Sequence, residues 1–316
     1  MSEVEYRCFR PGDEAAINEG FNRVFGTDRP LEEWYWKFPP QAGGRWVFLA
    51  CAEDGRVLAH YGAQMVRLCV DGLAVRAGHV VDVYSVPEVR GTHVFTLCYE
   101  KFITAFGSPT NLQMIIGFPG RRHYEMGLKA LNYIRLGEAT YWRRSRRPSL
   151  PRLGFRAREG FDPVTAEDLW LRAQVRYPVA LVRDAERLRQ RYTNRPGVKY
   201  VHLTVWRRGE PHAWGVAREV EGTLRIADLV WDGREPAALA AVDYAFGRVA
   251  GRFGCTKCEM WLRGDPEAEA ALARVGWRQE RNPLDLLLLA REIDPRVDFD
   301  ALARRGYFTM GDSDLV

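Results

Sequence analysis

Long hydrophobic runs are absent from this chain of 316 residues, although hydrophobic residues make up 47% of it. A helix that crosses a membrane needs about 20 consecutive apolar residues, and no segment approaches that length. The first residues, MSEVEYRCFRPGDE, are too acidic and polar for a signal peptide. We therefore expect a globular, cytoplasmic protein that has no membrane partner.

Cysteine is also scarce, with six residues in the whole chain. So few cysteines in so long a chain exclude a disulfide scaffold. Cys255 and Cys258, in the sequence CTKC, have the spacing of half a zinc or redox site. A zinc site would require a second pair or a histidine cluster nearby, and the sequence has neither. We therefore predict that the protein binds no metal.

Positive charge is present in excess, with a formal net charge of +5 at pH 7. Much of it lies in one mid-chain segment, YWRRSRRPSLPRLGFRARE, from Tyr141 to Glu159. Arginine clusters beside aromatic residues can bind nucleic acid. However, Pro148 and Pro151 break regular structure at the point where a two-domain chain needs a connection. We interpret the segment as a linker and do not expect a nucleic-acid partner.

The second half of the sequence repeats the pattern of the first. WVFLACAEDGRVLAHYGA, from Trp46, corresponds to YVHLTVWRRGEPHAWGVA, from Tyr200. The predicted equivalent pairs are Gly55 and Gly209, Gly62 and Gly215, Asp82 and Asp228, Gly107 and Gly254, and Gly127 and Gly276. Each half reads as a helix, antiparallel strands, a long strand, a helix, another strand and a last helix. The pattern predicts two α/β domains, each with a mixed sheet.

The segment VVDVYSVPEVRGTHVFTLCYEKF, residues 80–102, joins a long strand to a helix through a turn. Unpaired N–H groups and the positive end of the helix dipole make such a turn an anion site. The helix places Phe95, Cys98, Phe102 and Phe106 on one face, which we predict to be core.

The order of elements and several motifs resemble the GCN5-related N-acetyltransferase (GNAT) superfamily, in particular its members with two such domains. The likeness is carried by VDVYSVPEVRGTHVF, MIIGFPGRRHYEMGLKALNY, EEWYWKF and the tail YFTMGDSDLV. It implies two tandem GNAT-like acyl-CoA N-acyltransferase domains with an α/β fold. We expect a donor-binding domain over residues 1–142, a linker over 143–159, and a degenerate second domain over 160–316.

The resemblance also implies a phosphate loop for acyl-CoA, in which the family pattern is Q/R-x-x-G-x-G/A. The corresponding residues are Arg90, Gly91, Thr92, His93, Val94 and Phe95, so His93 and Phe95 replace the two glycines. Two interpretations of His93 remain open: it contacts phosphate beside Arg90, or the loop no longer binds CoA. A backbone N–H donor to the thioester oxygen is expected within Tyr84, Ser85 and Val86.

By the same resemblance, Tyr124 is the candidate acid that protonates the leaving thiolate, and His123 is an alternative. Asp82 is the nearest candidate base, although its repeat partner Asp228 favours a structural role for both. Asp312 and Asp314 are candidates for binding a cationic amine if the tail folds over the cleft. The alternative is a solvated acidic tail.

Together these features predict an acyl-CoA-dependent N-acyltransferase, more specifically an N-acetyltransferase, acting on a small amine such as an amino sugar or amino acid derivative. A non-catalytic tandem binding or scaffold module is the alternative. We expect only the first half to hold the donor, because Asp232 and Glu235 at the matching junction of the second half would repel a pyrophosphate.

Overall fold

The computed structural model describes residues 3–40, 44–146 and 150–315, and the chain forms two compact units. The first unit contains residues 1–68, 73–137 and 287–299. The second contains residues 69–72, 138–286 and 300–316. Neither unit is therefore one continuous segment, which differs from the sequence-based division at residues 142 and 160. Among the described residues, no helix has the length and apolar character needed to cross a membrane.

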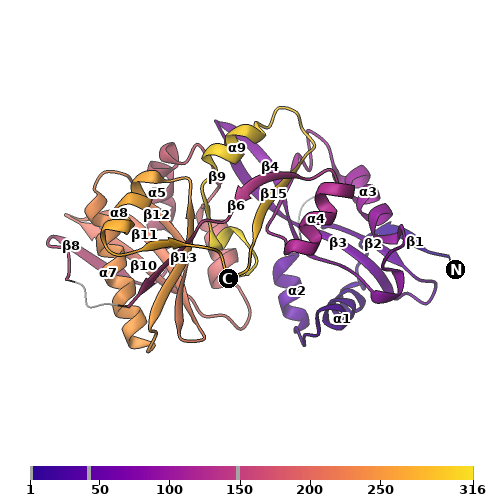
Figure 1. Cartoon of the computed structure of the whole chain (residues 1–316), viewed down its shortest axis with the longest axis horizontal. Coiled ribbons are helices and arrows are strands. Elements are labelled where there is room, and N and C mark those ends of the chain that lie inside the picture. The colour runs from indigo at the N-terminus through magenta and orange to yellow at the C-terminus, as the bar shows by residue number, and fades with distance from the viewer. Residues whose placement is uncertain (1–2, 41–43, 147–149, 316) are drawn as a thin grey trace. The chain divides into compact units, whose positions relative to one another are not determined.

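The first unit is built on one mixed sheet with the strand order β1-β2-β3-β4-β5-β15-β6 (Figure 1). Its strands are β1 (Glu5–Cys8), β2 (Trp46–Cys51), β3 (Val57–Val70), β4 (Leu73–Ser85), β5 (Met114–Gly117), β6 (Ile134–Glu138) and β15 (Leu287–Glu292). Its helices are α1 (Glu14–Phe25), α2 (Leu31–Lys37), the 3₁₀ turn η1 (Pro87–Val89), α3 (Val94–Phe106) and α4 (Arg121–Ala130). Figure 1 shows β15, coloured for the C-terminal part of the chain, among the strands of this unit.

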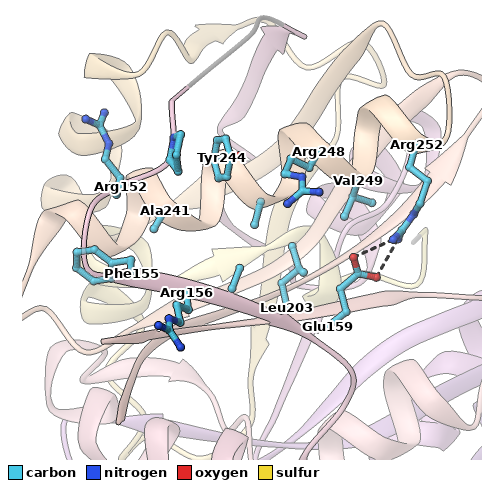
Figure 2. A pocket seen from close by; sticks show the side chains of 13 residues that line it. Arg152, Phe155, Arg156, Glu159, Leu203, Ala241, Tyr244, Arg248, Val249 and Arg252 are labelled. Atoms are coloured by element: carbon cyan, nitrogen blue, oxygen red, sulfur yellow. Dashed lines mark hydrogen bonds and ion pairs between the residues drawn. The ribbon is translucent and has the colours of Figure 1, made fainter. Parts of the chain in front are cut away.

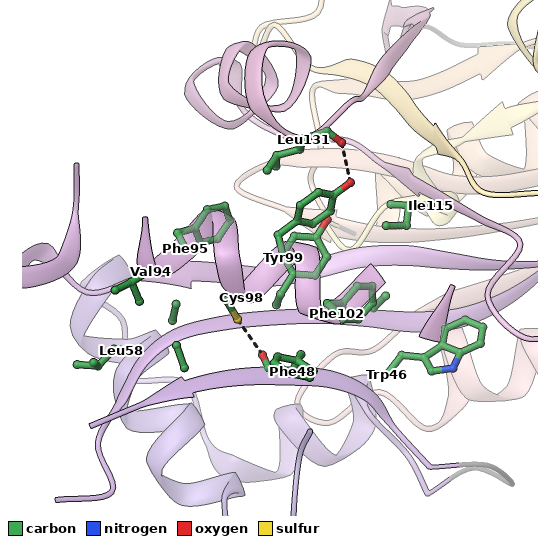
Figure 3. Packing of buried hydrophobic residues seen from close by; sticks show 14 of the residues in the cluster. Trp46, Phe48, Leu58, Val94, Phe95, Cys98, Tyr99, Phe102, Ile115 and Leu131 are labelled. Atoms are coloured by element: carbon green, nitrogen blue, oxygen red, sulfur yellow. Dashed lines mark hydrogen bonds between the residues drawn. The ribbon is translucent and has the colours of Figure 1, made fainter. Parts of the chain in front are cut away.

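The core of the first unit lies between the sheet and helix α3 (Figure 3). Phe95, Cys98 and Phe102 point from α3 into a cluster with Phe48 of β2, which confirms the predicted apolar face. The turn between β2 and β3 has Gly55 at φ +85°, a conformation that glycine adopts without steric cost. A second buried cluster, which includes Ile17 and Trp34, packs α1 and α2 on the sheet.

The second unit has a mixed sheet with the order β14-β7-β13-β12-β11-β10-β8. Its strands are β7 (Tyr141–Ser145), β8 (Phe155–Glu159), β9 (Val179–Leu181), β10 (Val201–Arg207), β11 (Glu210–Val220), β12 (Thr223–Trp231), β13 (Lys257–Arg263), β14 (Arg278–Glu280) and β16 (Phe308–Thr309). Its helices are α5 (Pro163–Ala173), α6 (Ala185–Leu188), α7 (Pro236–Arg252), α8 (Pro266–Arg274) and α9 (Phe299–Arg305). Shorter helical turns are η2 (Gln174–Arg176), η3 (Arg189–Thr193) and η4 (Met310–Asp312).

The two units share the predicted order of elements, so the internal repeat is also structural. α2-β2-β3-β4-α3-β5-α4 corresponds to α6-β10-β11-β12-α7-β13-α8. One predicted pairing is wrong by a residue. A Cβ on Gly62 would meet His60 and Phe38, whereas a Cβ on Gly215 would meet Phe246 of α7. Because neighbouring residues of a strand face opposite sides, these two glycines are not equivalent.

The arginine-rich segment that we interpreted as a linker is largely strand. β7 lies between β13 and β14, and β8 is the edge strand beside β10. Residues 147–149 lie outside the described part of the chain. The CTKC motif is at the start of β13, where burial raises the pKa of the Cys258 thiol to about 11. Burial therefore disfavours the thiolate form that a metal ligand requires.

Candidate functional site

The candidate site of the first unit lies where β4 continues beyond the end of β5. The two strands pair in parallel from Ala77 with Met114 to His79 with Ile116. β5 then ends at Gly117, whereas β4 runs on to Ser85. Within this extension Asp82 has φ +55°, which is rare for a residue other than glycine and interrupts the regular strand. The Nδ1 atom of His60 lies 2.8 Å from the Asp82 carbonyl oxygen and so donates a hydrogen bond to it.

The carboxylate of Asp82, our candidate base, is held in a buried ion-pair network. Arg29 Nη1 donates to one oxygen, and Lys37 Nζ lies 2.6 Å from the other. The Asp82 side chain is 1% exposed. A carboxylate that is buried and held by two cations is shielded from any substrate amine. The structure therefore corrects this assignment: Asp82 stabilises the unit and is not positioned as a base.

The same arrangement recurs in the second unit. Arg183 Nε donates to both oxygens of Asp228, at 3.0 and 3.2 Å. Arg29 directly precedes Pro30 and α2, and Arg183 precedes α6 in the same way. Sequence reasoning missed both arginines. An arginine at the same place in both repeats, opposite an aspartate at the same place, is the signal that would have identified these pairs.

The predicted donor loop divides into buried and exposed residues. Tyr84 and Val86 are buried, and so are Val94 and Phe95 at the start of α3. The Tyr84 hydroxyl donates to the Ile17 carbonyl at 2.9 Å. The Val86 N–H donates to the Leu58 carbonyl at 2.9 Å and is therefore not available as an oxyanion donor. Ser85 is half-buried.

The exposed part of the loop is a compact turn at the N-terminus of α3. Arg90, Gly91, Thr92 and His93 are all exposed, and Gly91 has φ +81°. α3 has no side-chain cap and no acidic residue in its first turn. The Val94 N–H donates to the Thr92 hydroxyl at 3.3 Å, and His93 at the N-cap position caps none of the N–H groups that follow. Uncapped N–H groups at the start of a helix can bind phosphate.

Tyr124 and His123 lie in the first turn of α4. Tyr124 is half-buried and packs against the core cluster of the first unit. The His123 ring contacts Phe95 and Tyr133, and its Nε2 atom is shielded from solvent without a hydrogen-bond partner among the described residues. Desolvation lowers the pKa of His123 to about 4. Burial therefore favours the neutral imidazole near pH 7, which is a weaker acid than the imidazolium, and the alternative assignment of His123 as the acid stays a prediction.

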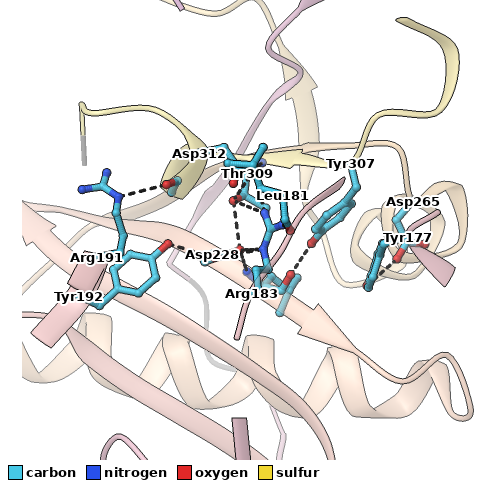
Figure 4. Close-up of polar contacts among 12 residues, drawn as sticks. Tyr177, Leu181, Arg183, Arg191, Tyr192, Asp228, Asp265, Tyr307, Thr309 and Asp312 are labelled. Atoms are coloured by element: carbon cyan, nitrogen blue, oxygen red, sulfur yellow. Dashed lines mark hydrogen bonds and ion pairs between the residues drawn. The ribbon is translucent and has the colours of Figure 1, made fainter. Parts of the chain in front are cut away.

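The chain's C-terminal segment lies between β12 and β13 in the second unit (Figure 4). β12 and β13 pair in parallel only from Thr223 with Lys257 to Ile226 with Met260. Beyond that point β16 pairs with β13, through Leu262 and Thr309. The Tyr307 hydroxyl donates to the Leu229 carbonyl of β12. The segment therefore lies where β12 and β13 are no longer paired. The corresponding place in the first unit is beyond the paired part of β4 and β5.

Asp312, predicted to bind a substrate amine, is part of this segment. Its carboxylate accepts from Arg183 Nη2 at 2.7 Å and from the Thr309 N–H at 2.9 Å. Burial raises the pKa of the Asp312 carboxyl. The side chain is 4% exposed and its acceptors are in use, so the structure corrects the expected substrate-binding role. Asp314 is half-buried, and the structure places no ligand role on it.

The junction that precedes α7 differs from the one that precedes α3. Glu235 occupies the N-cap position and pairs with Arg207, and Pro236 begins the helix. Asp232 lies 3.0 Å from His212 Nδ1 and accepts from the Arg234 N–H at 3.1 Å. Two carboxylates therefore stand at this junction. The first unit has Arg90 and His93 beside the helix and one acidic residue further from it, Glu88, which pairs with Arg23.

Comparison with known proteins agrees with this architecture. Residues 5–123 match the family described as the acetyltransferase (GNAT) domain. No curated protein matches the chain.

Solved structures are similar over nearly the whole chain. A probable N-acyltransferase from Enterococcus faecalis has a TM-score of 0.70 at 12% identity, over 94% of this chain and 74% of that one. A GCN5-related N-acetyltransferase from Anabaena variabilis gives 0.67 at 12%, over 96% and 75%. Saccharomyces cerevisiae N-myristoyltransferase with bound myristoyl-CoA gives 0.62 at 11%, over 93% and 83%. Residues 5–123 thus match the GNAT acetyltransferase domain, and the chain as a whole shares the fold of these GNAT-type structures.

Proposed function

We propose that the chain is an acyl-CoA-dependent N-acyltransferase whose first unit alone holds the acyl donor. The acyl group is most simply acetyl, and the acceptor is a small amine such as an amino sugar or amino acid derivative. The observation that carries this proposal is the uncapped N-terminus of α3, with Arg90 and Gly91 beside it. A pyrophosphate there would accept from the uncapped N–H groups that follow Val94 and from the guanidinium.

The contrast between the two units supports this division. In the second unit the chain's own tail, through Thr309 and Tyr307, fills the place between β12 and β13. Glu235 also stands at the N-terminus of α7, where its charge opposes that of a phosphate. The second unit therefore serves as a scaffold in this proposal.

In the reaction that we propose, the neutral amine nitrogen attacks the thioester carbonyl, the amide bond forms and the C–S bond breaks. The nitrogen loses one proton to solvent, which balances the proton that the departing thiolate gains. The departing thiolate needs a proton, and the Tyr124 hydroxyl is our candidate donor. We assign the step to Tyr124 in preference to His123, because burial lowers the pKa of His123 to about 4 and favours its neutral form. Asp82 is excluded as the base by its buried ion pairs with Arg29 and Lys37.

Calorimetry with acetyl-CoA tests donor binding. Arg90→Glu should abolish binding, because it replaces a cation at the phosphate position with an anion. Glu235→Ala is the matched control at the second junction and should leave binding nearly unchanged. The reverse pattern, or no heat at millimolar acetyl-CoA with either protein, contradicts the proposal.

Release of free thiol in the presence of a panel of amines then separates the enzyme from a non-catalytic binding module. Tyr124→Phe should lower turnover more than it weakens acetyl-CoA binding, since the hydroxyl acts on the leaving thiolate. Binding of acetyl-CoA without thiol release from any amine favours the binding module. If turnover is unchanged in Tyr124→Phe, Tyr124 has only a packing role in the core.

A further inference from the structure

The second unit contains an arginine-lined pocket that the proposed reaction does not use. It lies between β8, β10 and α7 and has a volume of about 520 Å³ (Figure 2). Its apolar floor includes Leu203, Ala157 and Ala245. Phe155 and Tyr244 add aromatic surface on opposite sides, one from the strand and one from the helix. A pocket of this size is suited to a small molecule.

Positive charge dominates the rim of this pocket. Arg152, Arg156, Arg248 and Arg252 all line it, against one acidic residue, Glu159. Glu159 is already neutralised by Arg252, whose Nη1 and Nη2 donate to its two oxygens at 2.8 and 2.9 Å. In the part of the chain that the structure describes, Arg152, Arg156 and Arg248 have no ion-pair partner. Figure 2 shows Arg248 projecting from α7 over β8.

The first unit shows that the fold does not require this space. Each unit has a bulge in the strand pair β2–β3 or β10–β11, after Ala50 and after Val205. Phe48 and Leu203 both lie two residues before their bulge and are therefore equivalent. In the first unit Phe48 belongs to the buried cluster, and Tyr6 of β1 packs against the same cluster. The second unit has the smaller Leu203, and small residues on β8 and α7 leave the pocket open.

We infer that this pocket is a second ligand site, which takes a small anion that carries a phosphate or carboxylate on an aromatic or other apolar body. Arg248 and its neighbours would bind the anionic group, because guanidinium forms paired hydrogen bonds with such oxygens. The apolar body would lie on Leu203 between Phe155 and Tyr244. The site is in the opposite unit from the proposed acyl-CoA site, so occupation of one does not require the other.

Ligand-observed NMR on the full-length protein, with phenyl phosphate as the probe, tests this inference. We expect saturable binding at millimolar probe or below, and binding at least about tenfold weaker for inorganic phosphate and for neutral benzyl alcohol. Arg248→Ala should weaken phenyl phosphate binding about tenfold, a factor typical of one lost charge-assisted contact. Arg158→Ala is the matched control, because Arg158 lies over Trp206 and outside the pocket. Benzoate in place of phenyl phosphate distinguishes a carboxylate site from a phosphate site.

A second variant keeps the test decisive if Arg248 has a structural role. Glu159→Gln frees Arg252 and removes the only acidic residue of the rim, so phenyl phosphate should bind several-fold more tightly. No binding of phenyl phosphate or benzoate, equal losses in Arg248→Ala and Arg158→Ala, or displacement of the probe by saturating CoA would each overturn the inference. Tight, salt-dependent binding of a short single-stranded oligonucleotide in place of the small probes would also overturn it, in favour of a nucleic-acid surface. Persistence of probe binding in Arg90→Glu separates this site from the proposed donor site.

Discussion

Buried ion pairs stabilise each of the two units from within. Asp82 with Arg29 and Lys37, and Asp228 with Arg183, place ionised groups inside the protein. Such groups are tolerated because each charge has an opposite partner, and removal of one partner leaves the other unpaired. We therefore expect a substitution of such a carboxylate to change the stability of the unit, whether or not it changes catalysis.

Asp82→Asn should therefore lower the free energy of unfolding by about 3–5 kcal/mol, because it leaves two buried cations without their carboxylate. Chemical denaturation followed by circular dichroism measures this loss. Asp54→Asn is the control: Asp54 forms an exposed pair with Arg56, and its removal should leave the free energy of unfolding almost unchanged. If Asp82→Asn is as stable as the control but has lost turnover, Asp82 is a base after all.

His123 should make the stability of the first unit depend on pH. Burial lowers its pKa from 6.5 to about 4, so between these values the unfolded chain binds a proton that the folded chain does not. The free energy of unfolding therefore falls as the pH is lowered from about 6.5 to 4. His123→Leu removes this proton uptake. The decrease measured between pH 7 and pH 4.5 should be smaller in the variant by about 1–2 kcal/mol, which allows for the partial exposure of the ring; parallel curves would show that His123 is solvated.

At the scale of elements, the proposed donor site depends on how α3 begins. Gly91 lies in the left-handed region immediately before the helix, and a Cβ there would meet no atom within 4 Å. The requirement for glycine is therefore one of backbone conformation and not of space. An alanine in place of Gly91 would favour a different turn, which would move the N–H groups at the start of α3.

Gly91→Ala should cost about 1–2 kcal/mol of stability, the usual strain of a left-handed L-residue, and should weaken acetyl-CoA binding as well. Gly55→Ala is a matched control, since Gly55 has φ +85° and also has no neighbour within 4 Å of a Cβ. It should cost the same stability and leave acetyl-CoA binding unchanged. Equal calorimetric affinities for the two variants would argue against a donor site at this turn.

At the scale of the whole molecule, each unit contains a strand from the other half of the sequence. β15, from Leu287 to Glu292, pairs with β5 in the first sheet. β7, from Tyr141 to Ser145, pairs with β13 in the second sheet. Each half of the sequence therefore lacks a strand that its sheet requires.

A fragment of residues 1–142, the predicted first domain, should consequently fail to fold cooperatively. Without β15, the edge of β5 and the apolar surface that Leu289 and Ala290 cover would be exposed, which favours aggregation. Fusion of residues 287–299 to residue 137 through a long Gly/Ser linker should restore a cooperative thermal transition by circular dichroism. A stable, monomeric fragment 1–142 would show that β15 is dispensable.

Much of this architecture was predictable because it depends on local patterns. The repeat, the glycine turns at Gly55 and Gly209 and the apolar face of α3 follow from residue periodicity and backbone preference. The turn from Arg90 to His93, where we propose that the phosphates of the donor bind, was predictable for the same reason. The chemistry of the site was less accessible: the roles assigned to Asp82, His123 and Asp312 depended on burial and on distant partners.

The sequence by itself determined two α/β units, their order of elements and the turn where an acyl donor is proposed to bind, because helices, strands and turns are specified by neighbouring residues. Only the tertiary structure decided which strands complete which sheet, that Arg29 and Lys37 neutralise Asp82, and that the tail fills the second unit. It also decided that a pocket opens between β8 and α7. These features join residues far apart in the chain, and pairings of that kind are set by packing and desolvation, which no local pattern encodes.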